Sequence, residues 1–145
     1  PYCAARGPEG HKTALRFMSK LLINLTRSLG IYEAFLAHMG GEHFVAVVNL
    51  EDYERFCKAL LQTFDTSVLQ LYSPQEQSHG HILATDKRGQ ERRCPLMALS
   101  VGVAHTQFRK YKSANKMFEV LAQVRQMAHP DGRSVMFVDR RCADR

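Results

Sequence analysis

The sequence has no apolar run that approaches the ~20 residues of a membrane span, and no signal-peptide pattern opens it. Its few cysteines form no CxxC pair or other metal-ligand spacing, which favours free thiols in a reducing compartment over disulfides. The pair His79 and His81 falls short of the four clustered ligands that structural zinc usually needs. We therefore expect a cytoplasmic protein without a membrane segment. The cysteines are Cys3, Cys57, Cys94 and Cys142.

Three motifs that mark large enzyme classes are also missing. The sequence contains no GxGxxG after a predicted strand, no Walker loop and no GxSxG nucleophile elbow. These absences argue against a dinucleotide dehydrogenase, a P-loop NTPase and an α/β-hydrolase.

The length and composition indicate one domain of ordinary size. The 145 residues are too few for two independent cores, and the contents of 45% hydrophobic and 23% charged residues are near the averages of globular proteins. Disorder, a collagen-like repeat and a coiled coil are therefore disfavoured. Lys and Arg outnumber Asp and Glu, and the net charge of +6 suits a phosphate-bearing partner.

The spacing of apolar residues predicts three amphipathic helices. In residues 14–29 apolar side chains recur every three or four positions, the spacing of one helical face, and Gly30 ends the helix. A second helix is predicted after Asn49, which can cap it, and ends near Asp65. A third begins at Ser113 and ends before residues 129–132.

Short apolar runs predict the strands. Residues 33–38 and 44–48 bracket paired glycines, which favours two strands joined by a tight turn. The polar segment 73–80 predicts a turn region. After it we expect a small exposed hairpin, a strand buried on both faces and a last strand, at residues 81–85 with 91–94, 96–103 and 134–138. The order predicts an α/β (α+β) fold, a mixed β-sheet covered by helices with a small β-hairpin insertion.

The turn Gly40-Gly41-Glu42-His43-Phe44 resembles the signature of GGDEF domains, the diguanylate cyclases that condense two GTP molecules into cyclic di-GMP. Residues 100–104 resemble the family's SxGxA strand, and residues 128–134 are similar to its AKxxGRN element. The segment from Leu71 and the hairpin after it resemble an insertion found in a GGDEF subgroup. The resemblance spans nearly the whole chain and implies a single GGDEF-like domain over residues 1–145, with a nucleotidyl-cyclase-like fold.

The resemblance implies that the catalytic site has been eroded. In the family, acidic side chains hold two divalent ions that bind the triphosphate. Glu42 keeps one acidic position and is the candidate metal ligand, but His43 stands where active cyclases have glutamate. An imidazole replaces neither the charge of a carboxylate nor its affinity for magnesium. The guanine-reading pair falls on Cys3 and Ala4. We expect no catalytic residue and no cofactor, with Mg²⁺ only where nucleotide binding is retained.

Two further positions are the candidate nucleotide-binding residues. Arg133 keeps one position of the family's phosphate grip, and His129 stands at the lysine position. Arg133 also fits a structural role, because a cation near a helix end favours the helix dipole. Glu42 fits a solvated turn residue as well as a metal ligand, and His43 fits a hydrogen-bonded turn residue better than a general base.

The resemblance also places the end of the family's first strand within residues 1–7. The strand that carries the first metal-binding aspartate would then lie before Pro1. We therefore expect the sequence to be part of a larger protein, without its upstream first strand.

Two functional hypotheses follow. The first is a catalytically inactive regulatory or dimerisation module in bacterial cyclic di-GMP-type signalling. Its candidate partners are other domains of the same polypeptide, a second copy of the chain, and GTP or another nucleotide. The alternative is a divergent diguanylate or nucleotidyl cyclase that still binds a nucleoside triphosphate with a divalent metal. A nucleic-acid-binding module would rest on the basic runs 92–93, 109–112 and 140–141, which fit solvated surface better.

Overall fold

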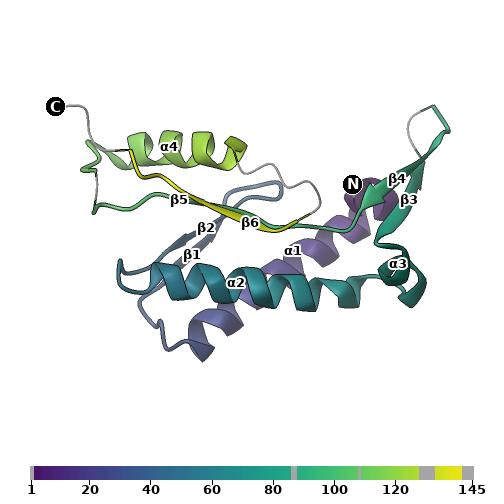
Figure 1. Cartoon of the computed structure of the whole chain (residues 1–145), viewed down its shortest axis with the longest axis horizontal. Coiled ribbons are helices and arrows are strands. Elements are labelled where there is room, and N and C mark those ends of the chain that lie inside the picture. Colours follow the sequence, from purple (N-terminus) through teal and green to yellow (C-terminus); the bar gives the residue numbers. More distant parts are fainter. Residues whose placement is uncertain (1, 86–87, 108, 128–132, 142–145) are drawn as a thin grey trace.

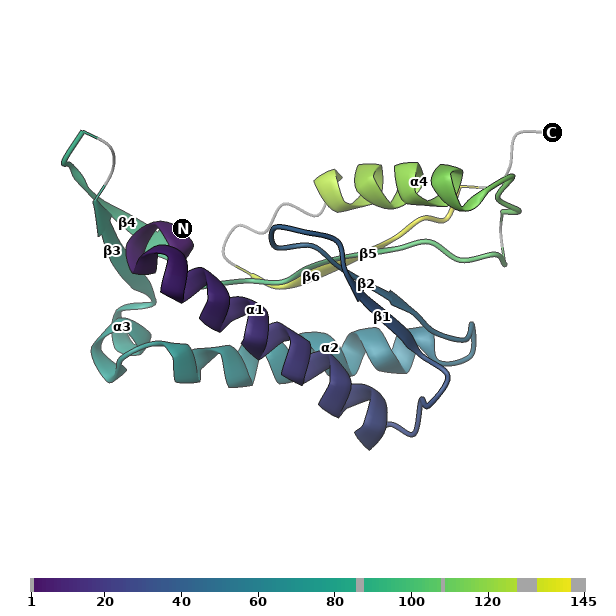
Figure 2. The same ribbon diagram turned by 180° about the vertical axis from the view of Figure 1, so that it is seen from behind.

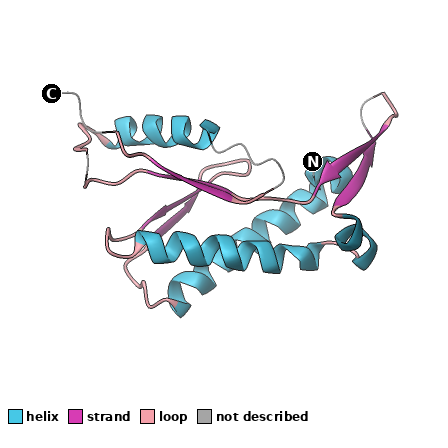
Figure 3. Ribbon diagram, in the orientation of Figure 1, coloured by secondary structure: helices cyan, strands magenta, loops and turns pink. Residues whose placement is uncertain are grey.

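The computed structural model describes residues 2–85, 88–107, 109–127 and 133–141. Within these ranges helices lie on both sides of short strands, which confirms the expected mixture of α and β structure (Figures 1 and 3). The elements in chain order are α1 (Tyr2–Ser28), β1 (Phe35–His38), β2 (Phe44–Val47), α2 (Tyr53–Ser67), the 3₁₀ turn η1 (Val68–Leu71), α3 (Pro74–His79), β3 (His81–Thr85), β4 (Glu91–Pro95), β5 (Ser100–Val103), α4 (Ala114–Met127) and β6 (Val135–Val138).

The main hydrophobic core forms where α1 crosses α2 (Figure 2). Burial of one large aliphatic side chain stabilises a fold by roughly 1.5–3 kcal/mol, so this crossing is a major source of stability. Side chains of β1, β2, β5 and β6 pack against the same core. Its buried residues are Leu21, Leu22, Leu25, Ile31, Phe56, Cys57 and Leu60.

The strands of the described ranges pair in three separate two-stranded ladders. β1 and β2 are antiparallel, with Phe35 opposite Val47, and β3 and β4 are also antiparallel. β5 and β6 are parallel, with Val103 opposite Val138. The expectation of one mixed sheet is therefore wrong for this part of the chain. The first and third ladders contact the α1–α2 core through side chains such as Leu36, so shared packing brings them together.

Helix α1 begins at Tyr2, much earlier than expected, so residues 2–6 are helical where the end of a strand was predicted. Gly7, with φ 66° and ψ −162°, interrupts the helix. Pro8 then begins the longer segment, because its fixed φ suits the first helical position. A tertiary contact holds the first turn. The ring of Tyr2 packs edge-on against that of Tyr72, with centroids 5.3 Å apart.

Helix α3 lies in the segment 73–80, which was predicted as a polar turn. The Ser73 hydroxyl accepts a hydrogen bond from the Glu76 N–H, and the Glu76 carboxylate accepts one from the Ser73 N–H. This capping box, with Pro74 at the first helical position, is readable in the sequence and supports a helix too short to be stable alone. Glu76 also pairs with Arg6 of α1 at 2.6 Å.

Two other boundaries differ from the prediction. Helix α2 has Asp52 at its N-cap position rather than Asn49. Strand β5 is limited to residues 100–103 and is only partly buried, whereas a longer strand buried on both faces was expected. The segment before it is held by a side chain, because the Met97 N–H donates a hydrogen bond to the Tyr72 hydroxyl at 2.8 Å.

The remaining predicted elements are confirmed to within a few residues. Ser113 caps α4, since its hydroxyl accepts a hydrogen bond from the Lys116 N–H at 3.2 Å. Helix α4 contacts β5 and β6 on the face opposite the α1–α2 core (Figure 3). The β5–β6 ladder therefore has a helix on each side.

Candidate functional site

The signature turn joins β1 to β2 and is closed by its own backbone. Gly40 and Gly41 have φ values of 92° and 55°, a region that residues with side chains rarely adopt. The Met39 N–H donates to the His43 carbonyl at 2.8 Å, and the His43 N–H donates to the Gly40 carbonyl at 3.1 Å. The two glycines are thus required by the turn geometry, whatever the turn binds.

Side chains around the turn come from three elements. His38 Nε2 donates to the Gly41 carbonyl at 2.9 Å, and its ring packs on Phe44 with centroids 4.9 Å apart. The Glu42 side chain is 69% exposed, and its Oε1 lies 4.0 Å from Nδ1 of His11 in α1. The Glu42 carboxylate is therefore accessible to an ion or a ligand from solvent.

Of the two predicted nucleotide-binding residues, one lies in the part of the chain that the structure describes. Arg133 lies just before β6 and its side chain is exposed, whereas His129 lies outside the described residues. In the described part of the chain, Arg133 makes no hydrogen bond or ion pair with the signature turn. The next residue, Ser134, fixes this segment, since its hydroxyl accepts from the Leu99 N–H at 2.9 Å and donates to the Asp65 carboxylate. The predicted site residues are thus only partly brought together.

A second polar cluster, which no motif marks, lies at the carboxyl ends of β5 and β6 (Figure 1). Because these strands are parallel, the residues that follow them meet at the same end of the ladder. His105 and Asp139 are 7% and 6% exposed, and the Asp139 N–H donates to the Val103 carbonyl at 2.8 Å. In open α/β sheets this end of the strands is where ligands usually bind.

Asp139 is a buried anion enclosed by cations. The Arg141 Nε donates to Asp139 Oδ1 at 2.6 Å, and the Arg141 backbone N–H donates to the same oxygen at 3.3 Å. Burial alone would raise the pKa of Asp139, but the hydrogen bonds from Arg141 and the charges of Arg141 and Arg109 lower it below its usual value. Burial and the Asp139 charge raise the pKa of the Tyr111 hydroxyl. Asp139 Oδ2 and the Tyr111 hydroxyl have no hydrogen-bond partner among the described residues.

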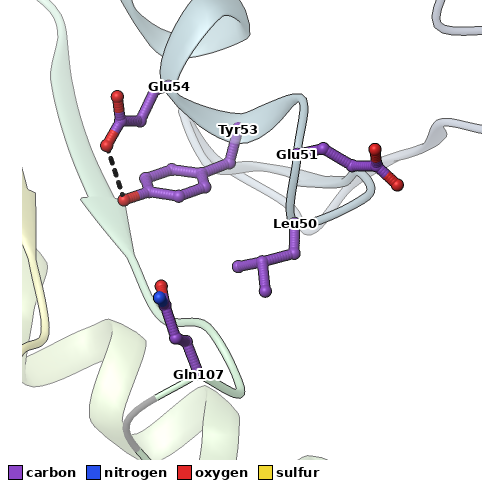
Figure 4. Close-up of a pocket in the computed structure, with 5 residues that line it drawn as sticks. All are labelled: Leu50, Glu51, Tyr53, Glu54 and Gln107. Carbon is purple, nitrogen blue, oxygen red and sulfur yellow. Dashed lines mark hydrogen bonds between the residues drawn. The ribbon is translucent and has the colours of Figure 1, made fainter.

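A depression of about 470 Å³ lies beside this cluster (Figure 4). Tyr53, in the first turn of α2, stacks on His105 with ring centroids 5.1 Å apart, and its hydroxyl donates to Glu54 Oε1 at 3.1 Å. The lining residues include Glu54, Tyr53 and Gln107, whose carboxylate, phenol and amide can bind polar or cationic ligands through hydrogen bonds, whereas the Glu51 carboxylate points away from them. Its lining residues are Leu50, Glu51, Tyr53, Glu54 and Gln107.

Part of this second cluster is readable in the sequence. Asp139 directly follows the apolar run 134–138, and His105 follows the apolar run 96–103. A polar residue at the end of a predicted strand is a candidate site residue in an α/β protein. The sequence does not state that the two strands are neighbours or that they are parallel, so it does not place the two side chains together.

Within the described ranges, no three His, Cys, Asp or Glu side chains are grouped so that they could hold a metal ion. His79 and His81 stack with centroids 5.7 Å apart, and His81 Nδ1 donates to the His79 carbonyl at 2.9 Å. None of the described helices combines the length and the apolar character needed to cross a membrane.

The chain matches no family model, no curated protein and no solved structure. The GGDEF resemblance therefore depends on the residues of the chain themselves.

Proposed function

We propose that this chain is a degenerate GGDEF-like domain that acts as a regulatory or dimerisation module in bacterial cyclic di-GMP-type signalling, without catalysis of its own. One observation carries the proposal. The residues Gly40-Gly41-Glu42-His43 form a closed turn between two antiparallel strands, and helix α2 follows the second strand. The resemblance to GGDEF domains predicts a signature turn between two strands that is followed by a helix. Most of the SxGxA-like segment forms strand β5, as the resemblance also predicts.

The proposed loss of catalysis is argued from the side chains of the turn. Two-metal phosphoryl transfer requires hard oxygen ligands with negative charge, because Mg²⁺ binds imidazole poorly. The turn contributes the Glu42 carboxylate and, at the next position, the His43 imidazole. The positions for guanine recognition, Cys3 and Ala4, lie in the first turn of α1 and carry no carboxylate or amide. Apolar residues of α1 and α2 form a buried core, which favours a folded module over an enzyme.

Calorimetric titration of GTP with Mg²⁺ tests this proposal. We expect no saturable heat at micromolar nucleotide from protein whose folding is verified by circular dichroism. Sedimentation velocity over a range of concentrations then measures whether the chain self-associates. Saturable GTP binding accompanied by turnover that disappears with a chelator would overturn the proposal of a module without catalysis, whereas saturable binding alone would identify GTP as a ligand of the regulatory module.

The alternative, a divergent nucleotidyl cyclase, is favoured by one observation. The Glu42 carboxylate is kept and is 69% exposed, so it remains accessible to a metal ion. If this alternative holds, Glu42→Gln abolishes Mg²⁺-dependent nucleotide binding and turnover of GTP or ATP. Glu91→Gln, which removes an exposed carboxylate of β4, is the matched control and leaves both unchanged.

A further inference from the structure

Two basic runs that are far apart in the sequence meet at one edge of the structure. Arg109, Lys110 and Lys112 follow β5, and Arg140 and Arg141 follow β6. Because β5 and β6 are parallel neighbours, both runs leave the ladder at its carboxyl end, next to the first residues of α4 (Figure 1). We call these five residues the basic edge.

Strand pairing and electrostatics place the two runs together. The Asp139 N–H donates to the Val103 carbonyl at 2.8 Å, so the ends of β5 and β6 lie side by side. Arg109 follows β5 and Arg141 follows β6, yet both charges act on Asp139 and lower its pKa against the effect of burial. The Arg109 guanidinium lies over the ring of Tyr111, 5.8 Å from its centroid. Burial raises the pKa of Tyr53, and the charge of Arg140 opposes this rise. The two runs therefore lie at the same end of the ladder.

Much of the positive charge of the basic edge is unpaired among the described residues. Asp139 is the carboxylate that the edge encloses; its side chain is 3% exposed and is paired with Arg141. In the described ranges Lys110, Lys112 and Arg140 are exposed and form no ion pair. Glu51 and the neighbouring Glu54 line the adjacent depression and bound the edge on the side of α2.

We propose that the basic edge binds the phosphate backbone of a nucleic acid without sequence preference. Charge complementarity is the argument, because exposed lysines and arginines at one edge are the usual electrostatic footprint of such binding. Exposed apolar side chains lie nearby, since Leu50 lines the adjacent depression and Phe137 belongs to β6. A protein partner and a membrane surface are therefore outcomes of the test.

Fluorescence anisotropy with a labelled single-stranded oligonucleotide of mixed sequence tests this inference in the full chain. We expect a dissociation constant between about 1 and 100 μM at low salt. The affinity should fall by about 50- to 130-fold between 50 and 200 mM salt for about four to five phosphate contacts. The triple variant Lys110→Ala, Lys112→Ala, Arg140→Ala should weaken binding by at least about tenfold. It should also reduce the slope of log K against log salt by about 2, since each phosphate contact on a single strand contributes about 0.7.

A matched control removes the same charge elsewhere. Lys20→Ala, Lys58→Ala, Arg93→Ala deletes three exposed cations of α1, α2 and β4, and it should change the affinity by about twofold or less. Circular dichroism verifies that both triple variants are folded.

Three results would overturn the inference. One is an equal loss of affinity in the two triple variants, which would mean that net charge and not the edge binds the oligonucleotide. Another is stronger binding of an acidic peptide of equal charge, which would identify a protein partner. The third is stronger binding of vesicles rich in phosphatidylserine, which would identify a membrane surface.

Discussion

Leu22 anchors α1 against α2, and we expect Leu22→Ala to destabilise the protein by about 3 kcal/mol. The Leu22 side chain lies in the main core, and the residue is 3% exposed. Its truncation loses about 2 kcal/mol of transfer free energy, and the space left in the core adds about 1 kcal/mol. Alanine's better helix propensity offsets only a few tenths of this loss. For a chain of this size the melting temperature should fall by about 10 °C.

Urea unfolding followed by far-ultraviolet circular dichroism measures this loss, and the next residue of the helix is the control. Ile23 is 42% exposed, so Ile23→Ala should cost about 1 kcal/mol or less. Equal losses in the two variants would refute the assignment of this face of α1 to the contact with α2.

Four further predictions test the signature turn, the α3 cap, the polar cluster and the core thiol. Gly40 has φ 92°, so Gly40→Ala should cost about 1–2 kcal/mol of unfolding free energy, and an unchanged urea midpoint would contradict this geometry. Ser73→Ala removes the cap of α3 and should cost about 1 kcal/mol in the same assay, whereas no loss would mean that the capping box does not form. Folding lowers the pKa of Asp139 from its usual value of 3.8. The ionised carboxylate therefore stabilises the fold at pH values above 3.8, and this stabilisation is lost as the pH falls through the lower pKa of the folded state. The stability difference between wild type and Asp139→Asn should therefore be constant from about pH 7 to 5 and shrink below about pH 4, as urea unfolding at each pH would measure. Burial raises the pKa of the Cys57 thiol to about 11, so iodoacetamide at about pH 8 should alkylate Cys57 only after unfolding, and mass spectrometry that finds it labelled in native protein would disprove its burial.

Much of the secondary structure was predictable because it depends on neighbours in the chain. Apolar spacing located the main part of α1, all of α4 and the two hairpins, since that spacing determines which face of an element avoids water. Paired glycines located the turn at Gly40 and Gly41, because positive φ is a property of single residues. Helix α3 also carries a local signal, because its capping box is readable at Ser73 and Glu76.

The sequence identified candidate site residues within one turn, but it did not identify their contacts with other elements. The signature turn, with Glu42 and His43, was identified from five consecutive residues, and the structure keeps those residues in one turn. The contact of Glu42 with His11 joins residues of different elements, so no local pattern contains it. Whether Glu42 and Arg133 bind a nucleotide remains a prediction.

The local sequence pattern thus determined most of the helices, the hairpins and the signature turn. Long-range packing decided how these elements contact one another. The first turn of α1 packs against the rest of the chain where Tyr2 meets Tyr72. The β1–β2 and β5–β6 ladders pack on the α1–α2 core, whereas Ile82 of the β3–β4 ladder packs in a second cluster with Tyr2 and Tyr72. Parallel pairing of β5 with β6 joins Asp139 to Arg109 and creates the basic edge. These contacts depend on strand direction and on which distant faces are buried together, and hydrophobic periodicity along one segment carries no information about either.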